Sequence, residues 1–383
     1  MKITSVDTFA LSNRRLLVKI TASTGQVGWG EATLENWVRP VAATVEQMAG
    51  ALVGEDPRRI THLWQVLSRG GFYRGGPVFS SAVSGIDIAL WDLVGRSLGA
   101  PIHDLLGGAA RERVRVYAHS NRRAGHTGDP ERAAELVRQG YTMIKVAPPG
   151  QTAFLDTAES LAGVVADLTE LRAAIGPAVD FAVDLHGRYS VPQSRRLLQR
   201  IADLDPIFVE EPLRPEHSAL IGDVVNVSGV PIATGERLYH RTEFRPVLEA
   251  GVAVVQPDLA HAGGISECFK IATQAEIYDA QVAPHCPLGP VAFAACLQID
   301  FAAPNALAQE CVIDLHAPDA GLGLELLDNP QALALVAGQV ERLSGPGLGI
   351  DINEDAVRAA VMEGSLPPGS PTWNYADGSF AEW

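Results

Sequence analysis

Six ionisable side chains stand at the ends of short apolar runs between residues 184 and 310. They are Asp184, Glu210, Glu236, Asp258, His285 and Glu310, and successive members are 22 to 27 residues apart. This interval is about the length of one strand plus one helix, so one group per strand would converge on one end of a parallel barrel. Each residue alone could instead cap a strand or the helix that follows it. Six such residues at regular intervals are harder to explain by coincidence.

Three of these side chains indicate a metal site. Asp184, Glu210 and Glu236 belong to successive runs, and three carboxylates in a partly dry pocket repel one another unless a cation joins them. Ligation by oxygen alone favours Mg²⁺ over Zn²⁺. A zinc site or a Cys–His nucleophile pair is disfavoured, because Cys286 directly follows His285 and should point to the opposite face of the strand.

Two histidines are placed for proton transfer. His186 lies two residues after Asp184 and shares its face while the strand continues, and His285 approaches from across the mouth. Imidazole titrates near neutral pH and can give or take a proton. Asp258 could hydrogen-bond His285 and raise its basicity, although a strand cap is the alternative. Lys145 also ends an apolar run, and we expect it to contact substrate or a carboxylate.

The elements that must position these groups are eight β-like runs alternating with longer amphipathic stretches. The runs are Val114–Ala118, Tyr141–Val146, Val179–Asp184, Ile207–Glu210, Ile232–Thr234, Val252–Gln256, Gln281–Ala283 and Ala306–Gln309. The pattern predicts an α/β fold, a (β/α)₈-type TIM barrel. A doubly wound sheet also alternates in this way, but no glycine-rich turn follows the first run.

The regions on either side of the barrel have different patterns of apolar residues. Residues 16–31 read as a hairpin with a turn at Ser23–Gly25, and residues 78–98 carry one apolar helical stripe. We therefore expect an α+β domain over residues 1–112, the barrel over 113–350 and a C-terminal tail over 351–383. The tail should contain a helix over Glu354–Met362 and pack back on another domain.

Composition narrows the function classes. The 383 residues are 47% hydrophobic and 20% charged, typical of a globular protein. The net charge of −15 disfavours binding to nucleic acid or to an anionic membrane surface. The four cysteines form no Cys-x-x-Cys pair, and the N-terminus has no apolar signal core. We expect a cytoplasmic protein with reduced thiols.

Several motifs carry a family resemblance over nearly the whole chain. They are Gly71–Pro77, Ile86–Asp92, Asp184–Arg188, Phe208–Pro212, Ala233–Arg237, Gln256–Ile265, Ala283–Pro290 and Gln309–Glu310. With them the chain resembles the enolase superfamily, mandelate racemase subgroup, and within it the galactonate dehydratases. The resemblance implies that the first domain caps the barrel mouth, that the tail returns to this cap, and that the protein is a homo-oligomer.

The resemblance also implies roles for the site residues. Asp184, Glu210 and Glu236 would bind Mg²⁺, with Glu210 rather than Glu211 facing inward. His285 would be the general base paired with Asp258, and His186 the general acid. Glu310 would hydrogen-bond the substrate carboxylate.

The implied reaction is dehydration of a sugar acid. The base removes the proton α to the carboxylate, Mg²⁺ and Glu310 stabilise the enediolate, and the acid protonates the departing 3-hydroxyl, giving a 2-keto-3-deoxy acid. D-galactonate is the first substrate to try. Gluconate, arabonate and fuconate are alternatives, as is a catalytically silent homologue that binds acid sugars. Racemisation is disfavoured, because Ala147 replaces the second lysine of a Lys-x-Lys base. The loops around Trp37 and Arg122 do not match the family and leave the stereochemistry open.

Overall fold

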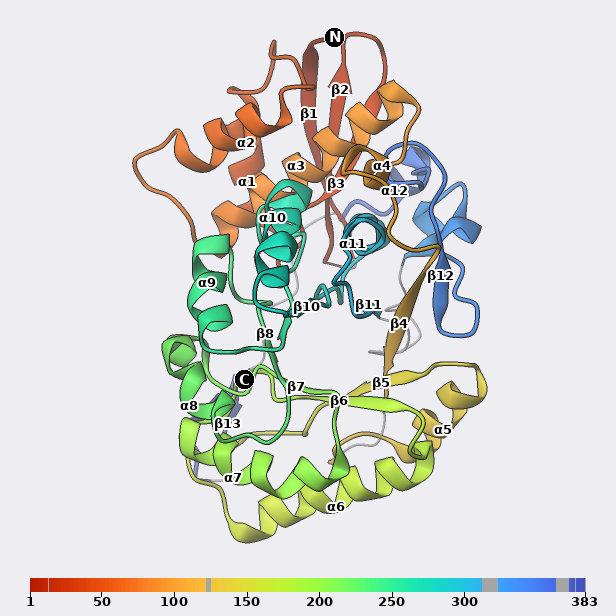
Figure 1. The fold of residues 1–383 in the computed structure, drawn as a ribbon. Coiled ribbons are helices and arrows are strands. Elements are labelled where there is room, and N and C mark those ends of the chain that lie inside the picture. Colours follow the sequence, from red (N-terminus) through yellow and green to blue (C-terminus); the bar gives the residue numbers. More distant parts are fainter. Residues whose placement is uncertain (13, 122–124, 312–322, 363–371, 376, 383) are drawn as a thin grey trace.

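The computed structural model describes the chain except for residues 13, 122–124, 312–322, 363–371, 376 and 383. Eight parallel strands form its central sheet (Figure 1): β4 (Arg113–His119), β5 (Met143–Val146), β6 (Asp180–Asp184), β7 (Phe208–Glu210), β8 (Ile232–Thr234), β9 (Val254–Val255), β10 (Gln281–Val282) and β11 (Gln309–Cys311). Strands β4 to β10 pair in chain order, and β11 pairs with β4. A bridge between Val282 and Ala306 joins β10 to the segment before β11 and closes the barrel. The predicted fold class is confirmed, and β11 begins three residues later than expected.

Seven helices lie between successive strands: α5 (Pro130–Arg138), α6 (Ala158–Ile175), α7 (Val191–Ile201), α8 (Ile221–Val225), α9 (Arg241–Glu249), α10 (Gly264–Glu276) and α11 (Pro290–Ala302). Short 3₁₀ turns, η1 (Ala202–Leu204) and η2 (Pro215–Leu220), flank α7 and α8. Polar side chains start four of these helices, because Asp129, Thr157, Ser190 and His240 each accept a hydrogen bond from a backbone N–H of the first turn. Helix α11 lies almost wholly inside the protein, which explains why it is apolar on every face.

One layer of side chains fills the barrel interior. Each strand region contributes one buried member: Tyr117, Met143, Ala182, Phe208, Ala233, Val254, Ala283 and Ala308. Since side chains alternate across a strand, the residue two positions further on faces the same interior, at the carboxyl end of the barrel. This layer is therefore the floor of the site described below.

The N-terminal region forms a separate layer at the top of Figure 1. Its elements are the antiparallel strands β1 (Ile3–Ala10), β2 (Leu16–Ala22) and β3 (Val27–Glu31), and the helices α1 (Val38–Ala49), α2 (Ile60–Arg69), α3 (Pro77–Leu98) and α4 (Ile102–Leu105). The predicted hairpin and helix are both present. Strand β3 lies directly on α3, because a Cβ at Gly28 or Gly30 would come within 2.2 Å of an α3 carbonyl oxygen. We call this N-terminal layer the cap.

Helix α3 is long and apolar enough to cross a membrane, but 78% of its most apolar window is buried inside the protein. This burial is expected for the central helix of a folded domain. Its polar side chains Asp87 and Asp92 are buried as well and accept backbone hydrogen bonds from other parts of the chain.

The C-terminal segment touches both layers. Its elements are η3 (Leu324–Leu326), η4 (Pro330–Leu333), β12 (Gln339–Glu341), α12 (Glu354–Ala359), β13 (Trp373–Asn374) and β14 (Phe380–Ala381). Helix α12 is followed by Val361, which forms a bridge with Leu11 of the cap. The hairpin β13–β14 lies instead on a barrel loop, where the Tyr375 hydroxyl donates to the Thr152 carbonyl at 2.8 Å. The division at residues 112 and 350 remains our proposal.

Candidate active site

The alternation of side chains brings the ionisable groups together. Two positions beyond the interior layer, six strand ends carry His119, Lys145, Asp184, Glu210, His285 and Glu310. Each of them therefore faces the barrel mouth. The strand β8 departs from the rule, because Gly235 stands at that position and Glu236 follows it.

A turn that only glycine tolerates brings Glu236 to the mouth. Gly235 has φ of 144°, and a Cβ there would lie 2.7 Å from Phe244 and 2.9 Å from the Gln256 nitrogen. Glu211 holds this turn, since its carboxylate accepts hydrogen bonds from the Thr234 hydroxyl at 2.7 Å and the Gly235 N–H at 3.0 Å. Glu211 thus shapes the end of β8, whereas Glu210 faces the barrel interior.

The three carboxylates Asp184, Glu210 and Glu236 each offer an oxygen within 4.8 Å of the others. Burial and the charge of Asp184 raise the pKa of Glu210 well above its ordinary value, and burial also raises the pKa of Glu236. The pKa of Asp184 is lowered despite its burial, because His186 and Lys145 stabilise the charged form. Buried oxygen donors that repel one another in this way fit a divalent cation.

Lys145 is the positive centre of this cluster. Its ammonium lies 2.9 Å from both oxygens of Glu210, 2.6 Å from Glu310 and 3.3 Å from Asp184. These carboxylates raise the pKa of Lys145 well above its ordinary value, although burial opposes the charge. Of the two roles expected for Lys145, the structure shows the contact with carboxylates.

His285 is oriented by Asp258. The ring Nδ1 lies 2.8 Å from Asp258 Oδ2, and the other ring nitrogen, Nε2, lies 3.5 Å from Glu236 Oε2. Burial disfavours the charged ring, but Glu236, Glu310 and Asp258 together raise the pKa of His285 well above its ordinary value. This environment increases the basicity of Nε2.

His186 reaches the cluster by a turn rather than by a continuing strand. Strand β6 ends at Asp184, and His186 has a left-handed φ of 52°. Its backbone N–H donates to Asp184 Oδ1 at 2.9 Å, and its Nε2 lies 3.1 Å from Asp184 Oδ2. The side chain is 36% exposed, which leaves room for a substrate. His186 thus lies beside Asp184, as predicted, but a left-handed turn rather than a continuing strand brings it there.

Glu310 completes the group with a histidine that the sequence left unassigned. His119 Nε2 lies 2.8 Å from Glu310 Oε1, and the Cys286 N–H donates to Glu310 Oε2 at 2.8 Å. Although burial opposes it, Lys145, His285 and His119 lower the pKa of Glu310 well below its ordinary value, while burial lowers the pKa of His119. The signal for His119 was its position two residues after the apolar Tyr117.

The structure describes the unmatched loop around Trp37. Trp37 follows the loop after β3 and is 56% exposed. Arg122 lies outside the described residues.

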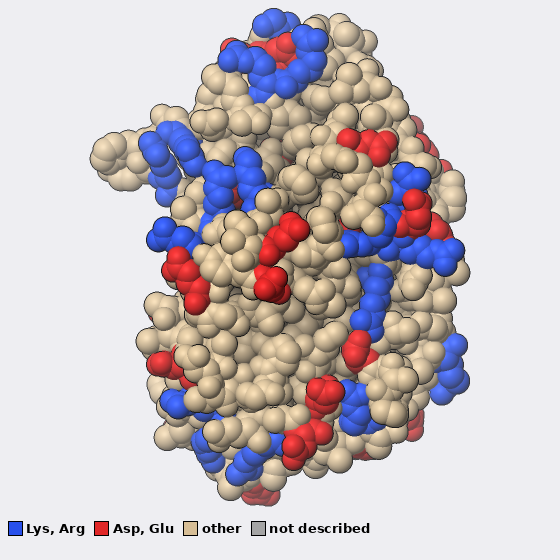
Figure 2. All heavy atoms as spheres, in the orientation of Figure 1, with Lys and Arg blue, Asp and Glu red and all other residues tan. Residues whose placement is uncertain are grey.

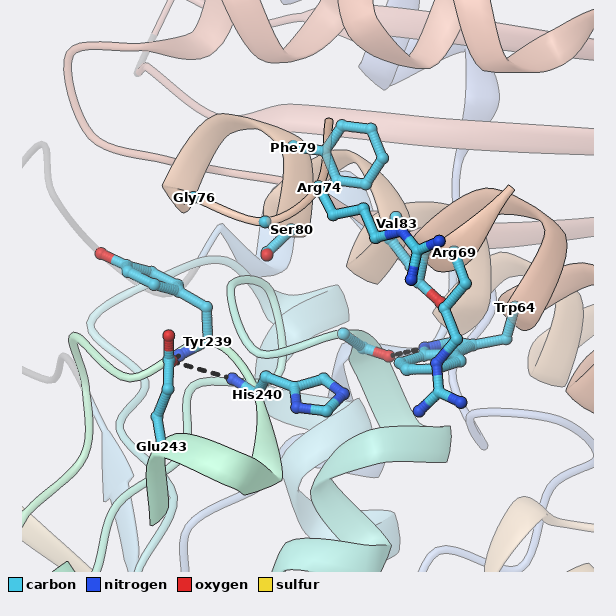
Figure 3. A pocket seen from close by; sticks show the side chains of 13 residues that line it. Trp64, Arg69, Arg74, Gly76, Phe79, Ser80, Val83, Tyr239, His240 and Glu243 are labelled. Carbon is cyan, nitrogen blue, oxygen red and sulfur yellow. Dashed lines mark hydrogen bonds between the residues drawn. The ribbon is translucent and has the colours of Figure 1, made fainter. Parts of the chain in front are cut away.

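A cavity of about 370 Å³ separates the cap from the barrel near the end of β8 (Figure 3). Trp64 and Phe79 line it from the cap, and Tyr239 and His240 line it from the barrel. None of the seven predicted site residues lines this cavity.

A closed barrel with carboxylates and histidines at its mouth, beneath an α+β cap, defines an enzyme of the enolase superfamily. Residues 129–356 match the family model of the enolase C-terminal domain-like fold, and residues 2–107 match the mandelate racemase/muconate lactonizing enzyme N-terminal domain. The chain therefore belongs to the mandelate racemase/muconate lactonizing enzyme family of the enolase superfamily.

Individual relatives are similar over their full length. The chain is 43% identical to a D-galactonate dehydratase of Ralstonia nicotianae and 42% identical to one of Verminephrobacter eiseniae, covering 100% of each chain in both pairs. The solved mandelate racemase/muconate lactonizing enzyme of Jannaschia sp. CCS1 is 29% identical, with a TM-score of 0.87 over 95% of this chain and 99% of that one.

Proposed function

We propose that this protein is a Mg²⁺-dependent sugar acid dehydratase, with D-galactonate as its substrate. The observation that carries the proposal is the pair of histidines on either side of the carboxylate cluster, with His285 beside Glu236 and His186 beside Asp184. The full-length relatives named D-galactonate dehydratase support the choice of substrate.

The histidines divide the proton transfers. Because Nδ1 of His285 is engaged by Asp258, Nε2 is the nitrogen that would remove the proton α to the substrate carboxylate. His186, on the opposite side of the carboxylate cluster, would protonate the departing 3-hydroxyl. The resulting enol then tautomerises to a 2-keto-3-deoxy acid.

The remaining groups would stabilise the negative charge on the substrate. Asp184, Glu210 and Glu236 would hold Mg²⁺, which when bound stabilises the negative charge that develops on the substrate carboxylate. Glu310 would contact that carboxylate, and the Lys145 ammonium 2.6 Å from Glu310 offsets the repulsion between the two anions.

Two further functions compete with this proposal. The same machinery would dehydrate gluconate, arabonate or fuconate if the mouth loops select another stereochemistry. A silent homologue would bind an acid sugar without turning it over, but two histidines placed to give and take protons beside the carboxylate cluster have no use in such a protein.

We also infer a cytoplasmic homo-oligomer that acts on small molecules. On the face shown in Figure 2, Lys and Arg lie in small groups among Asp and Glu, which agrees with the unfavourable net charge for nucleic acid or an anionic membrane. The described cysteines Cys268, Cys286 and Cys296 are buried and form no disulfide bond, as expected in a reducing compartment.

A panel of aldonic and aldaric acids tests the proposal directly. Each acid is incubated with the protein and Mg²⁺, and 2-keto acid formation is measured. We expect D-galactonate to give the highest kcat/KM. Turnover of another aldonic acid alone would correct the substrate, and Mg²⁺-dependent binding without any turnover, measured by calorimetry, would favour the silent homologue.

A further inference from the structure

The turn after β9, residues 258–266, connects the hydrogen-bonded pair of Asp258 and His285 to the cap. It begins with Asp258, the partner of His285, and leads into α10. The cap binds its second half at both ends. Trp64 Nε1 donates to the Gly263 carbonyl at 2.8 Å, and the Ser266 N–H donates to Asp87 at 2.9 Å.

His261 occupies the middle of this turn and is buried. Its Nδ1 lies 3.5 Å from Asp258 Oδ2, the same oxygen that His285 contacts at 2.8 Å. Its Nε2 lies 2.9 Å from the carbonyl oxygen of Thr33. Because a carbonyl only accepts hydrogen bonds, Nε2 must carry a proton and donate it. The ring of His261 therefore lies between the Thr33 carbonyl of the cap and the Asp258 carboxylate that orients the base.

Thr33 is a fixed point of the cap. Its hydroxyl accepts the Leu16 N–H at 3.0 Å and donates to Glu31 at 2.8 Å, so its carbonyl has a defined direction. The chain continues from Thr33 into the loop that carries Glu35 and Trp37. The Glu35 carboxylate itself lies 3.9 Å from His261 Nε2.

We propose that His261 is a positioning residue that holds Asp258, and through it His285, in register with the cap loop of residues 33–37. The inference rests on the proposed function, because it assigns the position of the base to a contact that the cap makes. Movement of this loop around a substrate would then change the orientation of the base.

A plain tether between cap and barrel is the competing explanation. It would need only the bond from Nε2 to Thr33, and a glutamine side chain can place an amide N–H near that position. An asparagine is shorter and can reach the Nδ1 position beside Asp258, but not Thr33. His261→Gln and His261→Asn therefore separate the two contacts.

The experiment compares kcat, KM and the isotope effect with substrate deuterated at C2. We expect both variants to lose about 10- to 100-fold in kcat with little change in KM, and to show a larger primary isotope effect, because proton removal becomes slower. Normal kcat and isotope effect in His261→Gln would show a plain tether and overturn the proposal. Normal values in His261→Asn would overturn the role of the cap loop.

A matched control is His103→Gln, which replaces another buried histidine, one whose Nδ1 lies 2.8 Å from Gln298. We expect it to lower the melting temperature without changing the isotope effect. If the wild type turns over no sugar acid, the proposed function fails, and proton NMR still tests His261. The low-field resonance of the His285–Asp258 hydrogen bond, identified by its loss in His285→Asn, should shift in His261→Gln. An unchanged resonance would overturn the proposal.

Discussion

The hydrogen bond between His285 Nδ1 and Asp258 Oδ2, 2.8 Å long, determines which ring nitrogen can react. Asp258 is itself fixed, because its other oxygen accepts the Ala260 N–H at 2.7 Å. The imidazole can therefore present only Nε2 to the carboxylate cluster. His186 instead contacts a carboxylate of the cluster itself, since its Nε2 lies 3.1 Å from Asp184 Oδ2. The different contacts of the two rings suit them to different proton transfers.

The different tasks of the two histidines can be separated by experiment. We expect His285→Asn and His186→Asn each to lower kcat by about 10²- to 10⁴-fold, the usual contribution of an acid or base. Only His186→Asn should still exchange the α-proton of D-galactonate in D₂O, since its base is intact. NMR of the recovered substrate measures this exchange. The control variant is His62→Asn, because His62 is exposed. Full activity in both site variants would refute the assignment of acid and base.

Lys145 and Mg²⁺ should stabilise the same carboxylates. Because Lys145 is the cation that contacts Glu210, Asp184 and Glu310, Lys145→Met leaves these charges facing one another. We expect this variant to have a lower melting temperature than the wild type in EDTA, and to gain more from added Mg²⁺. Thermal melts with and without Mg²⁺ measure both effects. An equal Mg²⁺ shift in the two proteins would contradict the shared site, and Glu210→Gln should reduce the shift in both backgrounds.

The fold and most of the site could be predicted from the sequence, because both depend on the periodic spacing of apolar residues. Apolar runs of the right spacing predicted every strand of the barrel, and the polar residue at each strand end faces the mouth whenever the strand stays regular. Periodic patterns do not predict the positions of residues where the backbone turns. No periodic pattern could choose Glu210 over Glu211, and His186 depends on a left-handed residue. His261 depends on a contact with Thr33, 228 residues away, which no local pattern contains.

Asp87 should make stability depend on pH. Burial raises its pKa from 3.8 to about 7, so the folded protein binds this proton more tightly than the unfolded chain. The stabilisation is complete below about pH 4 and is lost as pH rises to about 7, a change of about 4 kcal/mol at most. Asp87→Asn does not titrate and still offers an oxygen to the Ser266 N–H. We expect thermal melts to show this variant gaining stability over the wild type between pH 4 and pH 7.

The control for Asp87 is Asp104→Asn, which removes one negative charge from an exposed position. It accounts for the general effect of net charge on the melting temperature. A constant difference between Asp87→Asn and the wild type across this pH range would contradict the prediction.

Two adjacent aromatic rings on the cap should mediate self-association. Phe72 and Tyr73 are 92% and 88% exposed and belong to the loop between α2 and α3. The rings pack edge to face, and the residues on either side of them are joined because Arg74 Nε donates to the Gly71 carbonyl at 2.9 Å. Such a presented apolar pair is typical of an interface. Since burying one ring contributes up to about 3 kcal/mol, a Phe72→Ser/Tyr73→Ser variant should dissociate more readily, by up to about 100-fold for each ring that the interface buries. Light scattering after size exclusion measures the mass, with Ile277→Ser, 79% exposed on the barrel, as the control. A wild-type monomer, or a double variant that keeps the wild-type mass at all concentrations, would refute this role of the loop.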